Sequence, residues 1–175
     1  MINDIYALKN NKRMAKLIAR HKAGVVLMHM QGNPKTMQIK IQYRDLLKEI
    51  SAYLRSAVRF ALDAGISGSS IAVDPGFGFG KSIEQNLEIL SHFDFFSKLR
   101  CPVLAGLSRK SFIGNLLDAP VSGMLYGSLG AAAVAIQKGA HILRVHEVLA
   151  HRQLALLMDR TRSAGFFRGE MIHAG

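Results

Sequence analysis

The stretch VLAGLSRKSFIG, at residues 103–114, joins the end of an apolar run to two adjacent cations. The run ends in Gly-Leu-Ser, Arg109 and Lys110 follow, and Ser111 opens a segment that is typical of a helix. This order predicts a strand, a tight turn and a helix N-terminus, where unpaired N–H groups and the helix dipole favour anions. A solvated basic turn after a core strand would give the same local pattern, so the interpretation depends on the rest of the chain.

Short apolar runs alternate with amphipathic segments on both sides of this stretch. The clearest helix is 45–64, where seven apolar side chains fall on one stripe and Gly65 ends it. Alternation of this kind predicts an α/β fold with a parallel sheet and right-handed crossovers. The predicted strands are a strand end at 1–5 and strands at 25–30, 71–74, 103–107 and 141–145. The predicted helices are 9–21, 45–64, 83–99, 112–116, 123–138 and 148–161. Residues 1–165 form one predicted domain, and residues 166–175, which show no periodicity, a predicted disordered tail.

Composition excludes several classes of protein. The chain has 175 residues, of which 49% are hydrophobic and 20% are charged, which suits one globular core. No apolar stretch approaches the roughly 20 residues of a membrane helix, so we expect no membrane partner. The single cysteine, Cys101, predicts a reducing compartment and thus the cytoplasm. The net charge is +11, with six cations between Lys9 and Lys22. No aromatic residues are interleaved there for base stacking, so we expect a solvated helix face and no nucleic-acid partner.

Polar side chains follow each predicted strand. The carboxyl edge of a parallel α/β sheet or barrel is where ligands bind, and five such strand ends in a row favour a site over isolated capping residues. Asp74 suits a ligand with two adjacent N–H donors, and Asn3 suits the same ring. The loops after the last two strands carry phosphate-binding candidates, since such loops frequently bind phosphate in eight-stranded barrels. These candidates are Arg109, Lys110, Arg144 and His146.

The sequence does not support three more specific kinds of site. The loop at 76–82 reads GFGFGKS, but a P-loop needs glycine at the position of Pro75. Its glycines are expected to let the backbone pass close to a ligand. The seven histidines form no ligand-spaced set, so no metal site is predicted in this chain, and no nucleophile–histidine pair can be argued.

Four motifs together resemble dihydropteroate synthase, the folate-pathway enzyme family. In order they are MHMQGNPKTMQ at 28–38, DPGFGFGK at 74–81, GLSRKS at 106–111 and RVH at 144–146. The resemblance covers the chain from Ile2 to about Met158. It implies a (βα)8 barrel that joins p-aminobenzoate to 6-hydroxymethyl-7,8-dihydropterin diphosphate, giving 7,8-dihydropteroate and releasing pyrophosphate. A leaving diphosphate would be stabilised electrostatically while a cationic pterin methylene forms.

The resemblance also implies roles for individual residues. Catalysis falls to Lys110, Arg144 and His146, of which Arg144 and His146 bind the diphosphate. Ser111 and Phe79 contact p-aminobenzoate. The pterin-binding residues are Asn3, Met28, Asp74, Phe79, Gly106, Lys110 and Arg144.

The chain departs from the family in length. A (βα)8 barrel needs about 250 residues, and this chain matches the family from the end of the fourth strand to the eighth helix. The segment Asn-Val-Thr-Pro-Asp-Ser-Phe, which supplies the Mg²⁺ ligand in the family, has no counterpart here. We therefore expect Mg²⁺ as the family's cofactor with no metal ligand in this chain, and a homodimer for the intact family. Half a barrel exposes unpaired edges, so we expect the isolated chain to be inactive and to need a partner for stability.

Other interpretations remain open. The chain could be a non-catalytic remnant or an assembly module of the same fold. A methyltetrahydrofolate-dependent methyltransferase shares the pterin-binding fold, but it has no use for GLSRKS or for the Arg144 and His146 anion site. Glu147 stands where the family usually has Asp, a difference expected to matter little.

Overall fold

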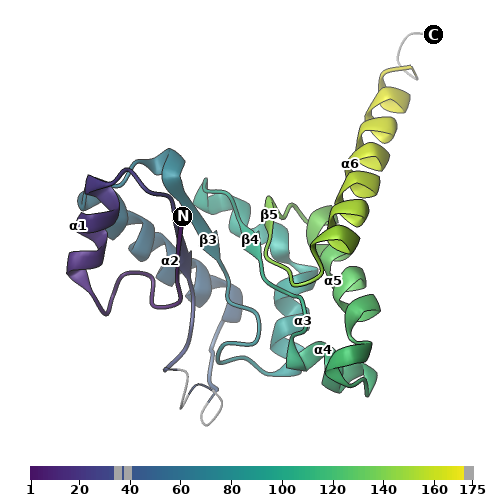
Figure 1. Cartoon of the computed structure of the whole chain (residues 1–175), viewed down its shortest axis with the longest axis horizontal. Coiled ribbons are helices and arrows are strands. Elements are labelled where there is room, and N and C mark those ends of the chain that lie inside the picture. The colour runs from purple at the N-terminus through teal and green to yellow at the C-terminus, as the bar shows by residue number, and fades with distance from the viewer. Residues whose placement is uncertain (34–36, 38–40, 172–175) are drawn as a thin grey trace.

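A computed structural model describes residues 1–33, 37 and 41–171. Within these residues short strands alternate with helices (Figure 1). The strands are β1 (Ile2–Asp4), β2 (Val25–Met28), β3 (Ile71–Asp74), β4 (Leu104–Ala105) and β5 (Ile142–Leu143). The α-helices are α1 (Lys12–Arg20), α2 (Leu46–Asp63), α3 (Ile83–Ser91), α4 (Ser111–Leu117), α5 (Leu125–Gln137) and α6 (Val148–Met171), and the 3₁₀ helices are η1 (Gly68–Ser70), η2 (Phe93–Leu99) and η3 (Val121–Gly123).

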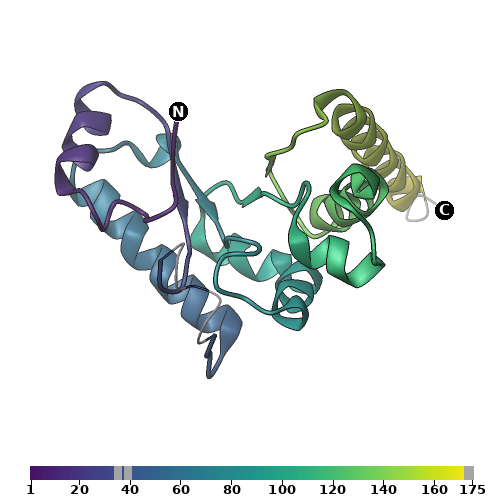
Figure 2. The same ribbon diagram turned by 60° about the horizontal axis from the view of Figure 1, so that its bottom comes forward.

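The strands are parallel and neighbour one another in chain order. β1, β2 and β3 form one sheet, and β4 pairs with β5. A bridge between Val73 and Val103 joins the two, with the Val73 N–H donating to the Pro102 carbonyl oxygen at 2.9 Å. Figure 2 shows the strands along the inner side of an arc and the helices around its outer side. This is part of a (βα)8 barrel, so the predicted fold class is confirmed.

Alternation along the strands divides the side chains between two faces. The outer face packs under the helices in two large apolar clusters. The inner face carries a small buried cluster of Val26, Ala72 and Leu104, with Ile142 packed against it. Every second side chain of a strand points to the same face of the sheet. Two residues beyond each member of this inner cluster, at the carboxyl end of the strand, the sequence therefore has a predicted site residue. These positions are Met28, Asp74, Gly106 and Arg144.

The helix predicted at 45–64 and the strand predicted at 71–74 are confirmed. Asp45 caps α2, where its side chain accepts from the Lys48 N–H at 3.1 Å. The single helix predicted at 83–99 is wrong in its second half, because α3 ends at Ser91 and a 3₁₀ helix follows. Phe93 and Phe96 lie three residues apart, so a 3₁₀ turn places both rings on one side, and both are buried.

The last helix is longer than predicted. α6 continues to Met171, ten residues past Thr161, so the predicted tail is helical from residue 166 to residue 171. Residues 162–171 contain no proline, and glycine weakens a helix without ending it. Residues 172–175 of the predicted tail lie outside the described residues.

Candidate active site

Asp74 ends β3 on the inner face with its side chain fully buried. Its Oδ1 accepts a hydrogen bond from the Gly76 N–H at 2.7 Å. Its Oδ2 has no hydrogen-bond partner among the described residues and lies 3.2 Å from Nη2 of Arg144. Burial raises the pKa of Asp74, against the opposing effects of Arg144, the Gly76 N–H, Lys110 and Lys81. The site therefore contains a buried carboxyl oxygen that can accept from a ligand N–H.

Arg144 follows β5, and its side chain reaches Asn3 of β1, so it links the last and the first of the described strands. Its guanidinium donates to the Asn3 side-chain oxygen and forms the ion pair with Asp74. Gly106, on the neighbouring strand, makes room for it, since a methyl group there would overlap Nη2 and lie 3.1 Å from Cζ. Asn3, Asp74, Gly106 and Arg144 are thus brought together as the sequence predicts.

Lys110 and Phe79 meet beside this group. Nζ of Lys110 lies 4.2 Å from the centre of the Phe79 ring, within cation–π distance. Burial lowers the pKa of Lys110 to about 8, with Asp74 opposing the shift and Arg144 adding to it. Met28 is completely buried and is the register partner of Asp74. The predicted pterin-binding residues therefore form one continuous group.

His146 is held through a network that sequence reasoning missed. The buried Ser108 hydroxyl lies 2.9 Å from Nδ1 of His146 and donates to Glu147 Oε2 at 3.3 Å. Glu147 also forms an ion pair with Arg109. The sequence did contain a signal for this network. Ser108 and His146, 38 residues apart, follow consecutive predicted strands, and consecutive parallel strands usually lie side by side.

Ser111 is exposed at the first residue of α4. Its predicted contact with p-aminobenzoate stays a prediction. Residues 34–36 and 38 of the MHMQGNPKTMQ motif lie outside the described residues.

Two glycines of the 75–80 loop, Gly76 and Gly80, lie directly against the chain that follows β2. A methyl group at Gly76 would overlap the His29 carbonyl oxygen, and one at Gly80 would lie 2.9 Å from Gln31 Cβ. Both glycines have positive φ, of 76° and 66°. They allow close approach to the chain after β2, and the predicted close approach of this loop to a ligand stays a prediction.

Two buried polar residues, Lys81 and His29, lie behind this loop. Nζ of Lys81 is 3.1 Å from Nδ1 of His29, and burial lowers the pKa of Lys81 to about 7. Burial, together with the charge of Lys81, lowers the pKa of His29 to about 2. The buried position of Lys81 was not predicted, because an isolated lysine is usually exposed.

Acid is expected to destabilise the chain through His29. The folded state keeps this imidazole neutral down to about pH 2, whereas the unfolded chain binds a proton near pH 6.5. The free energy of unfolding should therefore fall below pH 6.5, by up to about 1.4 kcal/mol per pH unit. Urea unfolding at pH 6.5 and 5.5 measures this, with His29→Gln, which keeps an acceptor for Lys81, as the comparison. The variant should lose about 1 kcal/mol less over this interval, and an equal loss in both proteins would contradict the assignment.

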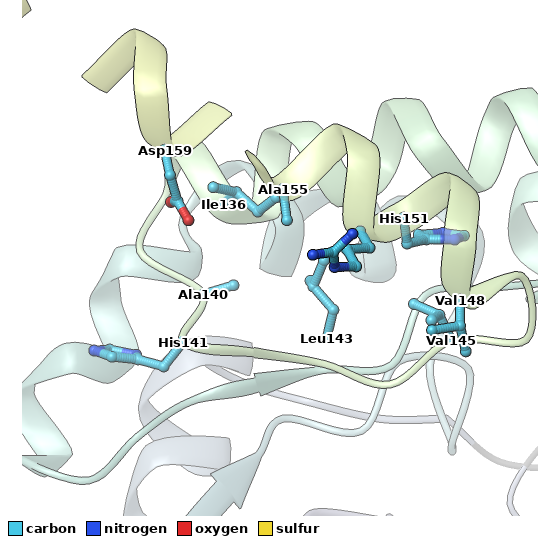
Figure 3. Close-up of a pocket in the computed structure, with 10 residues that line it drawn as sticks. Ile136, Ala140, His141, Leu143, Val145, Val148, His151, Ala155 and Asp159 are labelled. Atoms are coloured by element: carbon cyan, nitrogen blue, oxygen red, sulfur yellow. The ribbon is translucent and has the colours of Figure 1, made fainter. Parts of the chain in front are cut away.

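A separate pocket of about 380 Å³ lies between α5, β5 and α6 (Figure 3). It is on the outer side of β5, because Leu143 and Val145 line it while Ile142 and Arg144 face inward. None of the predicted site residues contributes to it. The pocket is therefore distinct from the site at the carboxyl ends of the strands.

The described part of the chain lacks two features, a metal-binding cluster and a membrane-spanning helix. No group of three or more His, Cys, Asp or Glu residues there could hold a metal ion. No helix in that part is long and apolar enough to cross a membrane.

Comparison with known proteins relates this chain to one enzyme family. The model of the pterin binding enzyme family matches residues 1–146. The chain is 41% identical over 164 residues to dihydropteroate synthase of Haemophilus influenzae, and 40% identical over 164 residues to that of Escherichia coli. Both alignments cover 94% of this chain, and they cover 59% and 58% of the respective relatives. The chain thus spans about three fifths of the length of these relatives.

Solved structures show the same relationship. Yersinia pestis dihydropteroate synthase, in complex with a sulfonamide drug, superposes with a TM-score of 0.89 at 36% identity, over 93% of this chain and 59% of that one. The Thermus thermophilus enzyme in complex with 6HMPPP gives 0.85 at 41% identity, over 91% and 63%. The chain therefore belongs to the pterin binding enzyme family.

Proposed function

We propose that this chain forms the pterin- and diphosphate-binding part of a dihydropteroate synthase active site. The reaction would join p-aminobenzoate to 6-hydroxymethyl-7,8-dihydropterin diphosphate and release pyrophosphate. One observation carries the proposal: Oδ2 of the buried Asp74 has no hydrogen-bond partner among the described residues, is ion-paired with Arg144, and is exposed to the charges of Lys110 and Lys81. The Thermus thermophilus structures with 6HMPPP and with 4-aminobenzoate support both small-molecule substrates.

The residues have distinct roles in this proposal. Asp74 Oδ2 accepts from the amino edge of the pterin, and Asn3 and Met28 line the same ring. Phe79 and Lys110 flank the ring, and Gly106 keeps Arg144 in reach of it. Arg144 and His146 hold the diphosphate and stabilise its charge as the bond from carbon to the leaving oxygen breaks. The amine nitrogen then forms the new bond to the methylene carbon and releases a proton.

Ser111 is the proposed contact for the p-aminobenzoate carboxylate. It begins α4 directly after Lys110, so a charged side chain and a hydroxyl lie together there. Phe79 would pack against the aminobenzoate ring on the pterin side.

Mg²⁺ stays part of the proposal for the family reaction. The described residues provide no cluster that fits it, so no step is assigned to it here. Its protein ligands would have to come from outside these residues.

We also propose a homodimer through the last helices, and a cytoplasmic location. Leu149 and Leu157 of α6 are 69% and 66% exposed, which supports a partner surface there. The mass of the chain in solution tests the dimer.

Cys101 is a free cysteine whose pKa is raised by burial, which fits a reducing compartment. The isolated 175-residue chain is expected to bind ligands without turnover.

A chimera tests the proposed chemistry directly. In it, this chain replaces the aligned part of the Haemophilus influenzae enzyme, and pyrophosphate release is followed with and without p-aminobenzoate. Release should depend on p-aminobenzoate and should fall by roughly tenfold or more in Lys110→Met. Lys98→Met, which changes an exposed lysine, is the matched control. A folded chimera without aminobenzoate-dependent release would overturn the proposal.

A further inference from the structure

Lys81 ends the glycine-rich loop, and its side chain turns back into the protein. The residue is 3% exposed. Its ammonium lies 2.9 Å from the Gly76 carbonyl oxygen, 3.0 Å from the Phe79 carbonyl oxygen and 3.1 Å from Nδ1 of His29. An ammonium has three protons, so these contacts use all of its donors. Lys81 is therefore not available to bind a phosphate.

The three acceptors belong to three places that must be held together. Gly76 begins the loop, and its N–H also fixes Asp74 Oδ1. Phe79 is at the far end of the loop and carries the ring that contacts Lys110. His29 follows β2, and its N–H donates to the Asp74 carbonyl oxygen at 2.9 Å. One buried ammonium thus ties both ends of the loop to the end of the neighbouring strand.

A second tether fixes the middle of the same loop. The buried Asn86 of α3 accepts from the Gly78 N–H through Oδ1 at 2.7 Å. Its amide nitrogen donates to the Ser82 carbonyl oxygen at 2.6 Å. The loop contains Gly76, Gly78 and Gly80, all at positive φ, and glycine restricts the backbone least. A loop of this composition needs such tethers to hold one conformation.

We propose that Lys81 is a positioning residue, which holds the 75–80 loop and thereby sets the Phe79 ring against the pterin. The inference rests on the proposed function for the ligand, and on the contacts above for the loop. Lys81 touches no reacting group itself. Its removal takes the ammonium donor from the Phe79 carbonyl oxygen and from Nδ1 of His29. The Gly76 carbonyl oxygen would keep only the Phe79 N–H, which donates to it at 3.1 Å.

The test compares Lys81→Met with the full unmodified chain in two measurements. Amide hydrogen exchange of residues 76–80 should become at least tenfold faster. The dissociation constant of 6-hydroxymethyl-7,8-dihydropterin should rise about tenfold, while that of pyrophosphate changes less than twofold. Ile18→Ala, in the separate apolar cluster under α1, is the control for general loss of stability. It should leave both measurements at the loop unchanged.

The outcomes separate the two proposals. If the unmodified chain binds neither the dihydropterin nor pyrophosphate, the proposed function is refuted. The exchange rates of residues 76–80 would still show whether Lys81 holds the loop. Unchanged exchange and unchanged dihydropterin binding in Lys81→Met would overturn the positioning role. If Lys81→Met does not fold, His29→Phe is used instead, because it removes one of the acceptors of Lys81. The exchange rate of residues 76–80 and the dissociation constant of the dihydropterin should then each rise about threefold. His29→Gln should restore both, and failure of His29→Phe to change either would equally overturn the inference.

Discussion

Asp74→Asn is expected to weaken binding of 6-hydroxymethyl-7,8-dihydropterin by roughly 100-fold. The substitution keeps the shape of the side chain and its place at the end of β3. It replaces an acceptor oxygen in a fully buried position with an amide, whose N–H₂ would face the donors of the ligand or leave the Gly76 N–H without its acceptor. Isothermal titration calorimetry with the full chain measures the dissociation constant.

Two comparisons make the Asp74 result specific. Asp94→Asn makes the same chemical change at an exposed position and should leave the affinity unchanged. Pyrophosphate should bind Asp74→Asn at least as tightly as before, because Arg144 loses its anionic partner. Unaltered dihydropterin affinity in Asp74→Asn would rule out this carboxyl as the pterin acceptor.

Gly106→Ala is expected to weaken pyrophosphate binding by roughly 10-fold to 100-fold. The added methyl group would overlap the Arg144 guanidinium, which then has to leave its contacts with Asn3 and Asp74. Backbone strain does not contribute, because Gly106 is not among the residues with positive φ in the described chain. Calorimetric titration with pyrophosphate at fixed ionic strength measures the loss.

A double-mutant cycle with Arg144→Met shows whether the glycine acts through the arginine. If it does, Gly106→Ala should add little to the loss in the Arg144→Met background. Gly130→Ala is the matched control, since open space surrounds Gly130 in α5 and alanine favours a helix. Additive losses in the cycle would mean that the glycine acts on something other than Arg144.

Sequence reasoning was strongest where a local period controls the structure. The stripe of α2 and the apolar run of β3 are local patterns, and both elements are found where predicted. Polar residues at strand ends also reveal the site, because parallel strands with right-handed crossovers bring their carboxyl ends to one edge. The inner-face repeat then places Asp74 and Arg144 together without further information.

The features that the sequence did not predict depend on contacts between segments far apart in the chain. The contact between Gly76 and the His29 carbonyl oxygen joins residues 47 positions apart, and that between Lys81 and His29 spans 52 positions. Ser108 meets His146 only once β4 and β5 have paired. No local pattern distinguishes a lysine that turns inward from one that reaches solvent, so the tethering of the glycine-rich loop could not be predicted.

The most direct test of the account is a crystal structure of the full chain with 6-hydroxymethyl-7,8-dihydropterin. The account predicts the amino edge of the pterin within hydrogen-bond distance of Asp74 Oδ2, with Lys110 and Phe79 beside the ring. The ring bound elsewhere, for example in the pocket between α5 and α6, would contradict it, as would an Asp74 that makes no contact with the ligand.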